Sequence, residues 1–220
     1  QICREPLCAV ARRGAIGYHP APLPRLRGRA AIPWTILLDE KITAGSLFWL
    51  APGVDAGPIL LQRFFHVAPD ETAASLYAGH MRVLDRLVRE AVPLLASGRP
   101  PREPQDERHA TWAAKRTPAD GRIDWTRSAQ AVWRLVRAVG RPYPGAFTSW
   151  QGRRLILWQA APWPQGGARH AAMPGQVVAR DATGFAVRCG DGQDLWVEAF
   201  AWAEAGSDAP PRLHARLGEG

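Results

Sequence analysis

The hydrophobic pattern changes at a polar, proline-rich segment, and this change most limits how the chain can fold. Residues 99–109 read RPPREPQDERH, a composition typical of a surface segment between folded parts. Before it, short apolar strands alternate with segments of helical spacing, as in α/β structures. After it, one helix is followed by short strands with hairpin turns. We therefore expect an α/β part first and a β part last.

The first part is predicted to contain short strands and longer helices, separated by turns. The run PAPLPRLR after the first strand breaks regular structure through its prolines, and the glycine-flanked turn at 53–57 joins the next two strands. Strands are expected at residues 15–18, 43–51 and 58–67, and helices at 4–13, 30–40 and 71–97.

The second part is predicted to be a small OB-like β-barrel. Thr126 is placed to cap a helix over 127–139, and the strands after it are separated by turn signals such as Asp191-Gly192. These strands are expected at 147–150, 155–159, 176–180, 185–189 and 195–199. The domain boundaries that follow are 1–110 for the α/β domain, 111–145 for a connecting segment with a helix, and 146–220 for the β domain.

Several classes of protein are disfavoured by composition. With 46% hydrophobic residues in 220, the chain can fill a core, yet no run approaches the roughly 18 to 20 apolar residues of a membrane span. The start lacks the layout of a signal peptide, so a cytoplasmic protein is expected. Cys3, Cys8 and Cys189 form neither an even disulfide framework nor a CxxC pair. The histidines lack ligand spacing, so no metal site is expected.

The basic residues are almost all arginine. The formal net charge is +8, and among 28 basic residues only Lys41 and Lys115 are lysine. Forked guanidinium groups suit phosphate or carboxylate partners, but a GC-rich coding sequence produces the same excess. The charge alone therefore does not choose between a phosphate-bearing ligand and a merely solvated surface.

His19 and Asp55 are the candidate catalytic residues. His19 follows the first strand and opens the proline-rich loop, and Asp55 lies on the glycine-flanked turn after the next strand. Consecutive strand ends can meet at one edge of an α/β sheet. A histidine held by a carboxylate is a common general base near neutral pH. The alternatives are a structural histidine beside a strand and an aspartate that only shapes a turn.

The motifs around these residues resemble the 10-formyltetrahydrofolate-dependent formyltransferase family. The resemblance begins with IGYHPAPLPRLRG at 16–28, Trp34 and GVDAGPIL, in which Asp55 follows His19 at the family's spacing. It continues in order over nearly the whole chain through DETAASLY, KRTPADGRIDW, VRAVGRPYPGAF, MPGQVV and GFAVRCGDG. The middle segment is most similar to enzymes that formylate UDP-4-amino-4-deoxy-L-arabinose, and methionyl-tRNA formyltransferase has a related architecture.

This resemblance implies an enzyme with a doubly wound, Rossmann-like α/β sheet and a C-terminal OB-like domain. It implies formyl transfer from 10-formyltetrahydrofolate to a primary amine of a small, phosphate-bearing acceptor, with His19 as general base, Asp55 as its support and no metal. By resemblance, Ala51, Val54, Gly57, Leu23 and Pro24 flank the folate, and Arg27 and Arg29 face the acceptor.

The sequence departs from the family in two ways. Gly17 stands where the family has an asparagine two residues before the histidine, and that amide would donate to the developing oxyanion. The N-terminal half of the α/β sheet is also missing before the strand that leads to His19, so the chain is expected to be a fragment of a longer product. The alternatives to transfer to a small amine are therefore a methionyl-tRNA formyltransferase, a 10-formyltetrahydrofolate hydrolase and a non-catalytic fragment.

Overall fold

The computed structural model describes residues 11–164, 171–204 and 209–218. Cys3, Cys8 and most of the helix predicted at 4–13 lie outside these residues. The chain divides into two compact units, and each is described by itself. One unit comprises residues 1–71 and 75–116, and the other comprises 72–74 and 117–220. The division thus falls after Arg116, and the helix predicted in a connecting segment belongs to the second unit.

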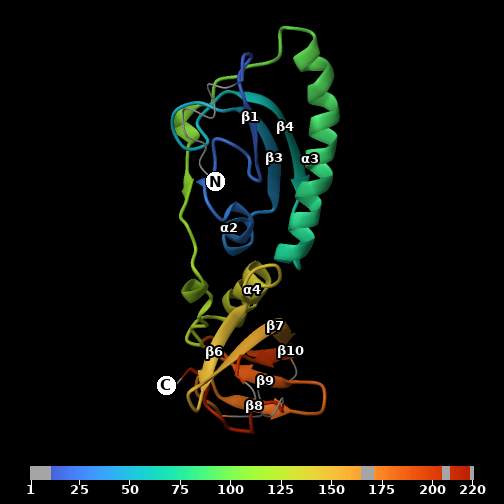
Figure 1. Ribbon diagram of the computed structural model, residues 1–220. Coiled ribbons are helices and arrows are strands. Elements are labelled where there is room, and N and C mark those ends of the chain that lie inside the picture. Colours follow the sequence, from blue (N-terminus) through green and yellow to red (C-terminus); the bar gives the residue numbers. More distant parts are fainter. Residues whose placement is uncertain (1–10, 165–170, 205–208, 219–220) are drawn as a thin grey trace. The chain divides into compact units, whose positions relative to one another are not determined.

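The first unit is built on an antiparallel sheet with β3 in the middle (Figure 1). Its strands, in the order β1-β3-β4, are β1 (Ile16–His19), β3 (Ile42–Trp49) and β4 (Ile59–His66). A mixed α/β architecture is therefore confirmed, but the parallel strands of a doubly wound sheet are not seen in this described sheet. The strands β3 and β4 are joined by a short turn, and strands joined in this way form an antiparallel hairpin.

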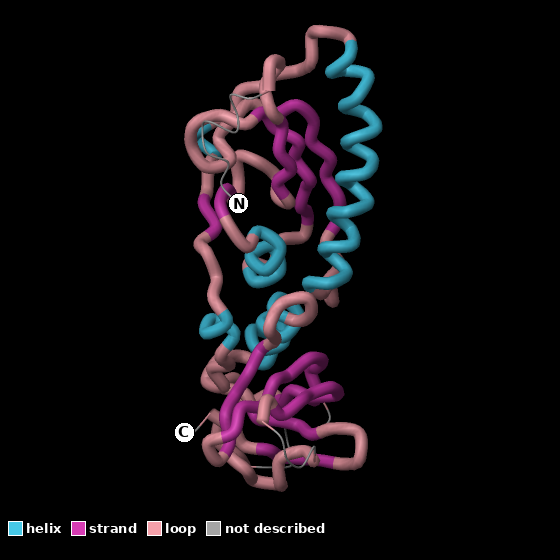
Figure 2. The backbone as a smooth tube through the Cα atoms, viewed as in Figure 1, coloured by secondary structure: helices cyan, strands magenta, loops and turns pink. Residues whose placement is uncertain are grey.

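The first unit also contains helices and a short pair of parallel strands. Leu87 and Ala91 of the long helix α3 share a core cluster with Leu47, Trp49 and Leu60 of the strands, and Figure 2 shows α3 running beside the sheet. The predicted helices at 30–40 and 71–97 correspond to α2 (Ala31–Leu37) and α3 (Ala73–Ala96). The other elements are the parallel pair β2 (Arg27–Gly28) and β5 (Trp112–Ala113) and the 3₁₀ turn η1 (Glu107–His109).

The second unit is a five-stranded antiparallel sheet with one helix against it. Its elements are η2 (Pro118–Gly121), α4 (Ala129–Val139), β6 (Ala146–Trp150), β7 (Arg153–Trp163), β8 (Val177–Arg180), β9 (Phe185–Arg188) and β10 (Asp194–Trp202). The strand order is β6-β7-β10-β9-β8. The predicted strands are thus present, but the closed barrel is not, because no ladder joins β8 to β6 within the described ranges.

The cap of α4 differs from the predicted one. Ser128, not Thr126, accepts the hydrogen bond from the backbone N–H of Ala131. The Thr126 hydroxyl instead donates to Asp124, two residues before it. A cap must lie directly before the first helical residue, so the later start of the helix at Ala129 excludes Thr126.

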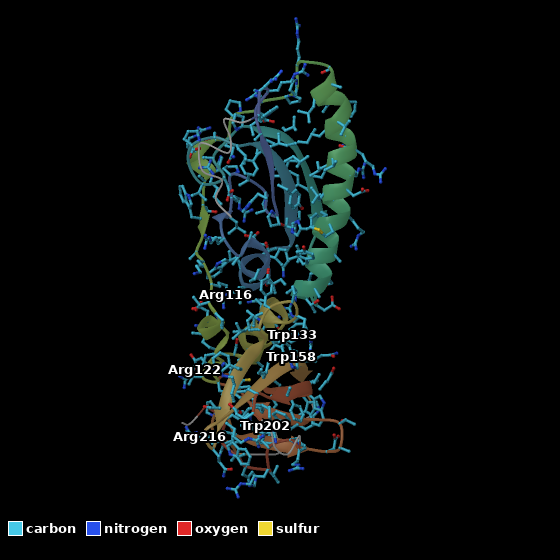
Figure 3. The ribbon with its side chains drawn as sticks, viewed as in Figure 1. Arg116, Arg122, Trp133, Trp158, Trp202 and Arg216 are labelled. Carbon is cyan, nitrogen blue, oxygen red and sulfur yellow. The ribbon has the colours of Figure 1, made fainter. Side chains whose placement is uncertain are left out.

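Arginine side chains cover tryptophan rings in the second unit. A guanidinium over an indole face is attracted by the ring's electron density while its stem covers apolar surface. The pairs are Arg137 with Trp133, Arg141 with Trp158 and Arg153 with Trp202, at 4.1, 4.7 and 4.4 Å from guanidinium carbon to ring centroid. Figure 3 labels the three tryptophans. Part of the arginine excess therefore serves packing within this unit.

Candidate active site

His19 and Asp55 lie side by side in the first unit. Nδ1 of His19 is 3.4 Å from Oδ2 of Asp55, and the two side chains are 7% and 20% exposed. The expected reason for this proximity is wrong, because β1 and β3 are antiparallel: His19 pairs with Ser46, whereas the end of β3 at Trp49 pairs with Ile16. The loop after β3 must therefore turn back to bring Asp55 to the histidine.

The second ring nitrogen of His19 is fixed by the backbone. Nε2 donates to the carbonyl oxygen of Leu26 at 2.7 Å. Because a carbonyl can only accept, the hydrogen of a neutral imidazole lies on Nε2, and Nδ1 carries the lone pair that faces Asp55. Nδ1 can then take up a proton, and the neighbouring carboxylate stabilises the imidazolium that forms.

The Asp55 carboxylate is held from the other side by Gly28. The Gly28 N–H donates to Oδ2 of Asp55 at 2.8 Å, so one oxygen faces both Gly28 and the histidine. Gly28 has φ +105°, and a Cβ there would lie 2.6 Å from the carbonyl oxygen of Ala113. A residue with a side chain would push the β2 backbone away from β5, and the donor to Asp55 would move with it.

Gln105 completes this arrangement, and it was not among the site residues predicted from the sequence. Its Nε2 donates to the carbonyl oxygens of Asp55 and Gly57 at 2.8 and 2.6 Å. The residue lies in the proline-rich segment 99–109, which has no periodicity to suggest a contact with the site. The only signal there was an amide side chain in a run of charged residues and prolines.

Arg27, which the resemblance placed toward the acceptor, is buried and paired with side chains of the first unit. It is 2% exposed, its guanidinium donates to both carboxylate oxygens of Glu107, and it also donates to Gln105. The hydrogen bonds from Arg27 lower the pKa of the Glu107 carboxyl. Arg29 differs, because its side chain is exposed while its backbone N–H donates to Ala113. Arg29 therefore offers a charge to solvent one residue after Gly28.

The residues expected to flank the folate are divided between surface and interior. Ala51 and Val54 are exposed, Val54 at 39%, and they lie in the same loop as Asp55. Gly57 is buried, and a Cβ on it would lie 1.7 Å from the carbonyl oxygen of Trp49. Leu23 and Pro24 are less open: Leu23 is 4% exposed and Pro24 is half-buried.

A second histidine lies on the other face of β1. The Tyr18 hydroxyl is 2.9 Å from Nδ1 of His80, which is fully buried. Burial, together with the charge of His19, lowers the pKa of His80 to about 4. At neutral pH His80 is therefore uncharged.

Two family models match the chain. One, described as "Formyl transferase", matches residues 1–91, and the other, "Formyl transferase, C-terminal domain", matches residues 115–205. The chain belongs to the formyltransferase family. Both halves of this formyltransferase chain are matched, and the change between them falls in the segment that the sequence marked by its prolines.

Solved structures also resemble this formyltransferase chain. HypX from Aquifex aeolicus in complex with tetrahydrofolic acid is 25% identical, with a TM-score of 0.70 over 86% of this chain and 32% of that chain. An N-formyltransferase from Helicobacter canadensis, in complex with folinic acid and dTDP-3-aminofucose, is 15% identical, with a TM-score of 0.65 over 83% and 65%. Methionyl-tRNA formyltransferase from Clostridium thermocellum is 24% identical, with a TM-score of 0.55 over 66% and 62%. The chain spans about a third of the length of HypX.

The described part of this formyltransferase chain offers no metal centre and no membrane helix. No group of three or more histidine, cysteine, aspartate or glutamate residues in it is arranged to hold a metal ion. Its helices are too short or too polar to cross a membrane.

Gly17 occupies the position where the resemblance expects an asparagine. It lies in β1 two residues before His19, so a side chain there would project from the same face of the strand. A Cβ at Gly17 would lie 2.9 Å from Cδ2 of Leu50 and 3.3 Å from the ring of Phe48. An asparagine here would therefore require the end of the Leu50 side chain to shift.

Proposed function

We propose that this chain carries the catalytic centre of an enzyme that transfers the formyl group of 10-formyltetrahydrofolate to a primary amine. The observation that carries the proposal is that His19 donates from Nε2 to the carbonyl oxygen of Leu26, while Nδ1 lies 3.4 Å from the Asp55 carboxylate. This arrangement fixes the tautomer and leaves one basic nitrogen beside a carboxylate. Family membership supplies the reaction type.

The reaction needs only the movement of one proton beside the acyl transfer. The amine nitrogen of the acceptor attacks the formyl carbon, and Nδ1 of His19 accepts the amine proton as the bond forms. The bond between the formyl carbon and N10 of the folate then breaks, and His19 returns the proton to N10. Asp55 stabilises the imidazolium between these steps. The products are the N-formylated acceptor and tetrahydrofolate.

The loop around Asp55 is suited to the formyl donor. Ala51 and Val54 expose their side chains on the loop that also holds the carboxylate, so a planar ring could lie against them. The complex of HypX with tetrahydrofolic acid supports a folate at this kind of fold. Asp55 is the more exposed member of the pair, so the substrates approach from its side.

Arg29 supports a small, phosphate-bearing acceptor such as a nucleotide-linked amino sugar. Its exposed guanidinium follows Gly28 directly and therefore lies close in sequence to the donor that holds Asp55. Guanidinium groups bind phosphate through paired N–H groups. Methionyl-tRNA is a larger acceptor of the same reactive amine, and binding that weakens steeply with salt would reveal it.

Hydrolysis of 10-formyltetrahydrofolate is the second candidate function. Gly17 favours it by resemblance, because the 10-formyltetrahydrofolate hydrolase domain of formyltetrahydrofolate dehydrogenase likewise lacks the asparagine at this position. In this reaction water replaces the amine, and formate is released.

Release of tetrahydrofolate from 10-formyltetrahydrofolate tests both functions. The release is followed by absorbance, first without an acceptor and then with a nucleotide-linked amino sugar or methionyl-tRNA. Release that requires an amine supports the transferase, and mass spectrometry of the acceptor should then show the added formyl group. Release at the same rate without an amine contradicts transfer and supports hydrolysis. No release under any of these conditions contradicts both proposals.

A further inference from the structure

We propose that Gln105 is the positioning residue that holds Asp55 at its working distance from His19. The inference rests on the proposed formyl transfer at this pair. It adds a residue that neither the motifs nor the family resemblance assigned, from a segment that reads as a linker.

The amide of Gln105 uses all its hydrogen-bonding capacity in one place. Nε2 donates to the carbonyl oxygens of Asp55 and Gly57, and Oε1 accepts from Nε and Nη2 of Arg27 at 3.1 and 2.8 Å. The two carbonyls need a donor and the guanidinium needs an acceptor. A glutamine side chain supplies both at this length, whereas glutamate or methionine cannot.

These bonds close a ring around the carboxylate. Gln105 holds the backbone of Asp55 and the side chain of Arg27, and the residue after Arg27, Gly28, donates its N–H to Oδ2 of Asp55. The backbone and the carboxylate of Asp55 are thus fixed by the same assembly. Glu107 holds the far side of the Arg27 guanidinium, which keeps that member of the ring in place.

The loop needs this support because its own conformation is unfavourable. Asp55 has φ +50°, a left-handed conformation that aspartate tolerates better than most residues with side chains but that is still less favourable than the right-handed regions. Such a residue persists only where its surroundings hold it. Without the two bonds from Gln105, the loop loses the contacts that oppose relaxation, and the carboxylate moves away from Nδ1 of His19.

The test compares Gln105→Glu with Gln105→Met and with Gln130→Glu as the matched control. Gln105→Glu retains an acceptor for Arg27 but sets a carboxylate against the two carbonyls. Gln105→Met removes the polar group without introducing repulsion. Gln130 is exposed on α4 of the second unit and takes no part in these hydrogen bonds, so its variant adds the same charge without removing any of them. Thermal unfolding of each variant shows that the proteins compared are folded.

Two measurements test whether Gln105 positions Asp55. In the transfer assay, both Gln105 variants should lower kcat by about tenfold to a hundredfold, as a small displacement of a catalytic group does, with KM changed by less than about threefold. By hydrogen exchange, the amide of Gly28 should lose protection in both variants, whereas that of Val67, which donates to Lys41, should not. Gln130→Glu should match wild type in both.

The two measurements separate this inference from the proposed function. If Gly28 loses protection in the variants while the wild type transfers no formyl group, the positioning role stands and the function fails. If folded Gln105 variants keep the kcat of an active wild type, or if Gly28 keeps its protection, the inference is overturned.

Discussion

His19 donates from Nε2 to the carbonyl oxygen of Leu26, and this bond decides which nitrogen of the ring is available for chemistry. Leu26 has φ +58°, so the chain adopts a rare conformation at the residue that orients the imidazole. The backbone therefore sets the tautomer, and Asp55 is left to stabilise charge on Nδ1. This division of roles would not be available if the carboxylate were the only partner of the ring.

Arg29 and Arg27 should respond differently to substitution. We expect Arg29→Ala to raise the KM for a phosphate-bearing acceptor by about tenfold or more, since a charged hydrogen bond contributes about 1.5 to 3 kcal/mol. Arg27→Met should instead lower the free energy of unfolding by about 1 to 3 kcal/mol, because Gln105 loses its donors. Steady-state kinetics and urea unfolding measure the two effects. An unchanged acceptor KM in Arg29→Ala would remove Arg29 from the acceptor site.

Introducing an asparagine at Gly17 should help transfer only if space is made for it. Gly17→Asn alone should cost about 1 to 3 kcal/mol of stability through overpacking against Leu50 and Phe48. In Gly17→Asn combined with Leu50→Ala, we expect the transfer rate to rise, by as much as about a hundredfold if the amide reaches the oxyanion. The comparison is with Leu50→Ala alone. A rate no higher than in that control would mean that another donor already serves the oxyanion.

Stability should fall in mild acid because of His80. Its pKa is lowered from 6.5 to about 4 in the folded protein, so between these values the unfolded chain binds the proton and the folded protein does not. His80 therefore leaves the free energy of unfolding unchanged above pH 6.5 and lowers it by about 3 kcal/mol in total as the pH falls toward 4.

The variant His80→Leu isolates this effect. Tyr18 can still donate to the backbone carbonyl of residue 80, so the variant removes the titrating group with little change in that contact. Urea unfolding at several pH values should show a shallower decline for His80→Leu than for wild type between pH 6.5 and 4. Parallel curves for the two proteins would assign the acid sensitivity to other groups.

Cys189 should resist alkylation in the folded protein. Burial, with Asp191 and Asp194 nearby, raises the pKa of its thiol to about 12, so almost no reactive thiolate is present at pH 8. Iodoacetamide labelling followed by peptide mass spectrometry should find Cys189 unmodified in the native protein and modified in guanidinium chloride. Rapid labelling of the native protein would show that this part of the second unit opens readily.

Local elements could be read from the sequence because each has its own signal. Alternating apolar residues and the turn at Gly53 to Gly57 fixed the hairpin of β3 and β4 within a few residues. That turn makes β3 and β4 antiparallel, because strands joined by a short turn cannot run parallel. The place of β1 beside β3 and the open second sheet emerged only from the structure, because no local turn sets them.

For the site, too, some residues could be predicted from the sequence and others could not. The pairing of His19 with Asp55 could be anticipated from their residue types and their positions after strands, although for the wrong geometric reason. The burial of Arg27 could not, because a loop arginine is usually solvated. Gln105 could not be predicted either, because its partners are backbone carbonyls that lie far away in the sequence.

Formyl transfer by His19→Ala and Asp55→Asn tests the central claim most directly. The matched controls are His66→Ala and Asp70→Asn, whose parent residues are exposed in the same unit. With 10-formyltetrahydrofolate and an amine acceptor, we predict that both site variants lose about a hundredfold or more of the wild-type rate while the controls retain it. Rates near wild type in folded His19→Ala or Asp55→Asn would contradict the assignment of this pair as the catalytic centre.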